Sequence, residues 1–163
     1  MSDDANPQPE AAPTPGAGAW LPLSLAAGAA AVFHAIPPLC TLAEKAGLGR
    51  QLWHPIDRLS PFLWERLIHA RLTAGWWQTG LGLVEVALCI AALTQARRRL
   101  TLAAMLFAGA AILNGADWFL SFDLLHNPAI NDPERRAAIT FAVSELALAL
   151  LLWLRVRSAG RSR

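Results

Sequence analysis

The sequence predicts an all-α integral membrane protein, a four-helix bundle with an interfacial amphipathic segment between its first and second helices. The chain of 163 residues is 55% hydrophobic and only 16% charged, with a mean hydropathy of +0.36. Soluble domains carry roughly 25% charged residues. The apolar residues are also gathered into four stretches, each long enough to cross a hydrocarbon core of about 30 Å as a helix rising about 1.5 Å per residue.

The predicted transmembrane domain covers residues 20–155, with spans at about 20–42, 72–93, 100–122 and 137–154. Helices are expected because backbone polar groups must be satisfied inside lipid, and no stretch alternates like a barrel strand. The proline-rich tail at 1–19 lacks the basic region of a signal peptide and is expected to be disordered. Residues 156–163 form a basic C-terminal tail.

The first span contains a proline pair at Pro37 and Pro38. Each proline removes a backbone donor, and the residue before a proline avoids helical angles. The regular helix is therefore expected to end near His34. The following residues are expected to form a kinked last turn or a short surface helix that ends at Gly47 or Gly49.

The stretch from 50 to 71 mixes apolar and charged side chains and is the predicted interfacial segment. Trp53 and Trp64 suit headgroup depth within it. The other tryptophans also lie near predicted helix ends, so all seven are expected to be belt residues rather than a ligand cage.

Of the 14 basic residues, 13 are Arg, mostly at the edges of apolar stretches, which indicates membrane anchors and not a nucleic-acid surface. Four spans place both termini and the "RRR" loop at 97–99 on one side. Basic residues divide seven to seven between the two sides. A cytoplasmic "RRR" loop is favoured, since charges in a very short loop weigh most. Cys40 and Cys89 match no disulfide or zinc pattern.

Polar residues inside the spans predict a polar intramembrane site formed by His34, Glu85, Asn114, Asp117 and Glu145. An Asp at a helix centre costs roughly 2.5–3.5 kcal/mol on insertion, so such residues face the bundle interior. Stripes at helical spacing, Gln78–Glu85–Cys89 and Asn114–Asp117–Ser121, support this placement. Counting residues from the "RRR" side predicts two tiers, Glu85 with Glu145 near the midplane and His34 with Asp117 deeper.

Several interpretations of this site stay open. The acids could be protonated packing devices, with small residues bringing the helices close. A divalent metal could bind His34, Asp117 and a loop histidine such as His126, although no HxxxH or ExxH spacing supports it. Haem held by His34 and His69, or a bound quinone, are further cofactor candidates.

The stretches "RLTAGWWQTGLGLVEVALCIAAL", "NGADWFLSFD" and "ERRAAITFAVSELALALLLW" follow one another with a basic turn after the first. This layout resembles that of DoxX-like small four-helix bacterial membrane proteins over about residues 20–155. The first span departs from it at "FHAIPPL". The resemblance implies a bacterial inner-membrane component associated with redox or quinone-linked partners.

The leading functional hypothesis is a non-catalytic accessory or redox-associated membrane component that sits in the bilayer with a membrane protein partner or as a homo-oligomer. A proton-coupled carrier that uses Glu85 and Glu145 is the first alternative, although no internal repeat indicates inverted halves. A quinone- or metal-dependent membrane enzyme is the second.

Overall fold

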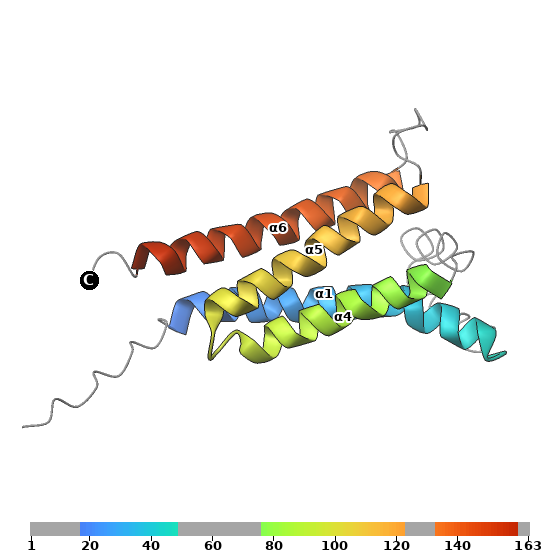
Figure 1. Ribbon diagram of the computed structural model, residues 1–163, viewed down its shortest axis with the longest axis horizontal. Coiled ribbons are helices and arrows are strands. Elements are labelled where there is room, and N and C mark those ends of the chain that lie inside the picture. The colour runs from blue at the N-terminus through green and yellow to red at the C-terminus, as the bar shows by residue number, and fades with distance from the viewer. Residues whose placement is uncertain (1–16, 49–75, 123–132, 160–163) are drawn as a thin grey trace, which may run out of the picture.

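The computed structural model describes residues 17–48, 76–122 and 133–159. Within these ranges the regular elements are four helices, α1 (Ala17–Lys45), α4 (Trp76–Gln95), α5 (Leu100–Phe122) and α6 (Pro133–Ala159). They run alternately in opposite directions, so that the start of α1, the end of α6 and the α4–α5 turn lie at one end (Figure 1). The all-α four-helix prediction is confirmed. The predicted interfacial segment lies outside the described residues.

All four helices are long and apolar enough to cross a membrane, over Gly18–Lys45, Trp76–Gln95, Leu100–Asp117 and Ile139–Ala159. Their side chains are arranged as lipid requires. Large aliphatic residues such as Leu25, Val32 and Leu151 are more than 60% exposed, whereas the interior consists largely of alanine. The chain is therefore an integral, multi-pass membrane protein.

Consecutive helices pack along their lengths, α1 on α4, α4 on α5 and α5 on α6, while α1 meets α5 and α6 over much shorter stretches. Without a hydrophobic driving force between helices in lipid, small side chains let backbones approach and gain van der Waals contact. Ala27, Ala92, Ala103 and Ala110 are fully buried and have this role, with Phe107 as the largest buried apolar side chain.

Helix α1 continues through Pro37 and Pro38 to Lys45, so the expected end near His34 is wrong. In lipid, breaking the helix would expose several backbone groups, whereas the two prolines deprive only the carbonyls of Phe33 and His34 of their helical N–H donors. The Thr41 hydroxyl donates a hydrogen bond of 3.1 Å to the Pro37 carbonyl within the same stretch.

The expected end of this stretch at Gly47 is confirmed. Gly47 has a φ of +73°, its N–H donates to the Glu44 carbonyl at 3.0 Å, and the Leu48 N–H donates to the Ala43 carbonyl at 2.9 Å. These are the paired hydrogen bonds of a Schellman motif, which satisfies the last carbonyls of a helix and favours glycine at its left-handed position.

Candidate functional site: a buried glutamate–histidine–glutamate triad

His34 on α1 lies between two carboxylates from two other helices. Its Nδ1 is 3.0 Å from Oε2 of Glu85 on α4, and its Nε2 is 3.0 Å from Oε1 of Glu145 on α6. The Glu145 contact is a hydrogen bond. The Glu85 contact has the distance of an ion pair, but Glu85 Oε2 lacks hydrogen-bond geometry. We call these three residues the triad.

The triad is almost completely enclosed by protein, with exposed fractions of 1% for His34, 0% for Glu85 and 4% for Glu145. Two aromatic rings form part of its enclosure. Phe33 and Phe141 each lie with ring centroids 5.7 Å from the His34 ring in edge-on orientations, and 4.5 Å from each other. The imidazole therefore has little freedom to rotate away from its two carboxylates.

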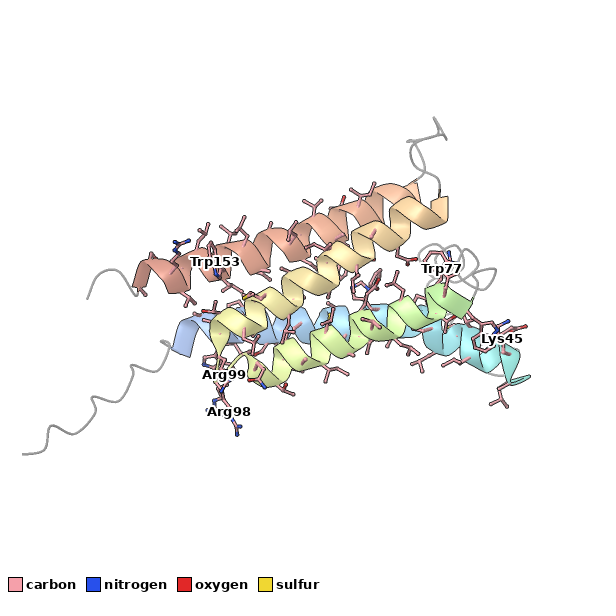
Figure 2. The ribbon with its side chains drawn as sticks, viewed as in Figure 1. Lys45, Trp77, Arg98, Arg99 and Trp153 are labelled. Atoms are coloured by element: carbon pink, nitrogen blue, oxygen red, sulfur yellow. The ribbon has the colours of Figure 1, made fainter. Side chains whose placement is uncertain are left out.

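Pairs of tryptophan and a cation mark the two ends of the bundle. The Lys45 ammonium lies 4.9 Å from the Trp76 ring at one end, and the Arg97 guanidinium lies 5.2 Å from the Trp20 ring at the other. Figure 2 shows Lys45 at one end and Arg98 and Arg99 at the opposite end. Amphipathic rings and snorkelling cations occupy the membrane interface, so we take these pairs as the two membrane boundaries.

Measured from these boundaries, the triad lies near the middle of the membrane. Glu85 follows Trp76 by nine residues and precedes Gln95 by ten, which is about 14–15 Å in each direction at about 1.5 Å per residue. A half-thickness of the hydrocarbon core is about 15 Å. Glu85 thus lies about as far from both membrane boundaries as a residue on α4 can.

The prediction of two tiers is wrong for His34, which lies level with the two glutamates. Because Arg97 lies over the Trp20 ring, these two residues are at the same depth in the membrane. His34 is fourteen residues from Trp20, about 21 Å, and Glu85 is twelve residues from Arg97, about 18 Å. The predicted spans ended at Leu93 and Leu154, whereas α4 and α6 continue further, which placed both glutamates too shallow.

The other predicted site residues that the structure describes are also buried. Asn114 and Asp117 on α5 are 0% and 2% exposed. His69 and His126, proposed as ligands from the loops, lie outside the described residues. In the stripe predicted on α4, Glu85 and Cys89 are buried but Gln78 is only half-buried.

Sequence reasoning missed two buried polar residues, Thr41 on α1 and Thr79 on α4. Thr79 is 5% exposed and takes the interior position that had been given to Gln78. The buried face of α4 consists of Thr79, Gly82, Glu85, Cys89 and Ala92. The spacing of three residues from Thr79 to Gly82 and to Glu85 is the signal that could have identified it.

Several buried polar atoms have no hydrogen-bond partner in the part of the chain that the structure describes. They are Thr79 Oγ1, both carboxylate oxygens of Glu85, Glu145 Oε2, and Oδ1 and Nδ2 of Asn114. Buried polar atoms are satisfied in the great majority of cases, so each exception requires an explanation such as water, an ion or a functional role. Three of these six atoms belong to the triad.

In the part of the chain that the structure describes, the donor set around His34 does not suit a haem or a resident metal. Both ring nitrogens of His34 face carboxylate oxygens, so neither offers a free lone pair to iron. Among residues 17–48, 76–122 and 133–159, no group of three or more His, Cys, Asp or Glu side chains is arranged to hold a metal ion.

The triad is instead suited to protons. An imidazolium can donate from both nitrogens to two carboxylates, which gives a net charge of −1, and one further proton on a carboxylate makes the cluster neutral. Because an uncompensated charge is expensive within a bilayer, such groups mark proton relays, ion paths or specific internal pairs.

Comparisons with protein-family models, curated proteins and solved structures returned no match to this chain. The class of protein is therefore defined by fold and site alone, as a small multi-pass membrane protein with a buried triad at mid-depth.

Proposed function

We propose that this protein is a proton-binding membrane component, in which the triad takes up and releases a proton within the bilayer. The observation that carries the proposal is the position of His34, with each ring nitrogen 3.0 Å from a carboxylate oxygen of a different helix. Each change of one proton changes the charge of this buried cluster by one unit. A contact that only held the helices together would not need a histidine between two carboxylates, because apolar side chains of similar size can replace such a buried ionic cluster.

The wider role is that of an accessory to a redox-active partner in a bacterial inner membrane, with both termini in the cytoplasm. The resemblance to DoxX-like proteins supports the redox association, and redox reactions of quinones consume and release protons. The four helices bury mainly alanine, so their large aliphatic side chains face outward. Such a surface can contact lipid, a membrane protein partner or a second copy of the chain.

Proton binding is tested by infrared difference spectroscopy on the full chain in lipid vesicles, titrated over pH. The expected signal is a carboxyl band that appears and disappears with pH and is altered by Glu85→Gln and Glu145→Gln. The matched control is Glu44→Gln, since Glu44 is exposed at the end of α1. A spectrum that is the same in all three variants and the wild type would exclude proton binding at the triad.

The accessory role is tested separately by native mass spectrometry of the protein extracted gently from its own membrane, beside an Asp117→Ala variant. A copurified polypeptide in both samples supports an accessory subunit. A bound small molecule that is lost with Asp117→Ala would favour the membrane enzyme, with a ligand at the polar end of α5.

A proton-coupled carrier is the second candidate, because the triad is about equally far from both membrane boundaries. A carrier would lose coupled flux in Glu85→Gln vesicles while remaining folded. Flux that is unchanged by Glu85→Gln removes this candidate.

A further inference from the structure

The bundle interior differs on the two sides of the triad. The contiguous hydrophobic cluster of the core lies on the side of Trp20 and Arg97, between the triad and that membrane boundary, whereas only Cys40 and Ala142 among the described buried hydrophobic residues lie on the other side. We call this side the apolar half. Its members are Leu23, Ala27, Ala30, Ala31, Cys89, Ala92, Ala96, Leu100, Ala103, Ala104, Phe107, Ala110, Ala149 and Leu152.

On the side of Lys45 and Trp76 the buried residues include several polar ones, and we call this side the polar half. Thr41, Thr79, Asn114 and Asp117 are all at least 95% buried. Counted from Leu100, Asn114 lies about 21 Å along α5, level with the triad, and Asp117 about 4 Å further. The apolar half contributes no side-chain atom to the set of buried polar atoms without a partner, whereas Thr79 lies in the polar half and Asn114 at its inner limit.

The proline pair adds backbone acceptors to the polar half. Pro37 and Pro38 have no N–H, so the carbonyls of Phe33 and His34 lose their helical donors. Helix carbonyls point toward the C-terminus, and α1 runs toward Lys45, so both carbonyls point away from the apolar half. Pro38, which lies one turn beyond His34, is fully buried.

We propose that water enters the bundle only from the Lys45–Trp76 boundary and reaches the triad through the polar half, which gives the proton site access to one face of the membrane. The use of such a water path rests on the proposed function, because the water would serve the proton site. Support for the path itself comes from other atoms than the contacts of His34. A buried water needs two to four polar partners. Thr79 Oγ1, both polar atoms of Asn114, and Glu85 Oε1 supply such partners, and the apolar half supplies none of this set.

The distances suit a short chain of waters. Thr79 and Glu85 are six residues apart on one face of α4, about 9 Å. This corresponds to roughly three steps at the hydrogen-bond length of about 2.8 Å. Gly82, buried between them on the same face, contributes no side chain that would block the path. On the opposite side, Cys89 and Ala92 continue the same face of α4 into the packed apolar half.

The test is thiol accessibility to Ag⁺, which is small and reacts with thiols in water. Both native cysteines are first removed by Cys40→Ala and Cys89→Ala. Thr79→Cys and Ala92→Cys form a matched pair, since each lies on the buried face of α4 three residues from its nearer end. Ag⁺ is added in chloride-free medium to right-side-out or inside-out membrane vesicles, and protection from later maleimide labelling of the denatured protein is measured.

We expect Ag⁺ to abolish labelling of Thr79→Cys when it is added at the Lys45–Trp76 face, and to leave Ala92→Cys fully labelled from either face. Asn114→Cys should behave as Thr79→Cys does, because it lies level with the triad. Equal protection of Ala92→Cys, protection from both faces, or no protection of Thr79→Cys would overturn the inference.

A second measurement needs no variant. Amide hydrogen exchange of the wild-type protein in lipid should be faster over residues 78–84 of α4 than over residues 86–92, since only the first group lines the polar half. Equal rates would contradict one-sided access. If access proves one-sided but the infrared spectrum does not change with pH, the proposed function fails and this inference survives. If the infrared spectrum changes with pH but access is not one-sided, this inference fails and the proposed function survives.

Discussion

His34 and Glu145 join α1 to α6 by a hydrogen bond of 3.0 Å between Nε2 and Oε1, with both side chains buried. These two helices are far apart in sequence and contact each other only over a short stretch. The hydrogen bond is therefore a large share of what holds the first and last helices together. The same atoms form part of the proposed proton site, so the stability of the bundle and proton binding both depend on the His34 side chain.

The first prediction concerns this link. Glu145→Ala leaves His34 Nε2 without its acceptor at mid-membrane, and breaking a buried pair by removing one partner costs about 3–5 kcal/mol. We expect a loss of that size in the free energy of unfolding, measured by titration with a denaturing detergent. Ser144→Ala is the control, since the neighbouring Ser144 is exposed and bonds only its own helix, and it should change stability by less than about 0.5 kcal/mol. Equal effects of the two variants would show that the hydrogen bond contributes little.

The second prediction separates stability from function. The triple variant His34→Leu, Glu85→Met and Glu145→Met replaces the whole triad by apolar side chains of similar size. Replacing a complete buried ionic cluster is often neutral or stabilising by about 1–4 kcal/mol. We expect the triple variant to unfold no more easily than the wild type, and to lose the pH-dependent carboxyl band. A triple variant less stable than Glu145→Ala would mean that the triad is retained for packing.

The sequence was sufficient to predict the fold, because four apolar stretches of membrane length admit few structures other than helices. It also identified the buried acids, since a residue such as Glu85 is expensive in lipid and must face inward, but it missed the buried hydroxyl residues Thr41 and Thr79, which carry no such cost. It failed on the arrangement of the triad. The depth of each residue in the membrane was counted from the predicted end of its span, and the helices extend beyond those ends. It failed at Pro37 as well, where the cost of exposing backbone to lipid exceeds the local preference of proline.

The third prediction tests the end of α1 with two glycines that differ in backbone conformation. A Cβ added at Gly47 or at Gly28 meets no atom within 4 Å, so only the backbone distinguishes the two sites. Gly47 has a φ of +73°, and an L-residue in that conformation costs roughly 1–2 kcal/mol. Gly28 lies within the helix, where alanine is favoured over glycine by roughly 0.5–1 kcal/mol.

We therefore expect Gly47→Ala to lower the free energy of unfolding and Gly28→Ala to raise it, in the same detergent titration. Opposite signs from identical changes exclude a general effect of the added methyl group. If Gly47→Ala proves neutral, the Schellman motif contributes nothing to the stability of the bundle.

The last prediction concerns orientation in the membrane. Both described chain ends and the turn that carries Arg97, Arg98 and Arg99 lie at the same end of the bundle (Figures 1 and 2). Arginines in a very short loop beside helix ends favour the cytoplasmic side. A C-terminal fusion to green fluorescent protein should fluoresce, and a fusion to alkaline phosphatase at the same position should be inactive.

Changing all three arginines to Gln removes the charge of this turn while leaving four basic residues in the C-terminal region. We therefore expect a mixed population in which both fusions give signal. An active phosphatase fusion to the wild-type chain would reverse the assignment, and the Lys45–Trp76 boundary through which we propose that water enters would then face the cytoplasm.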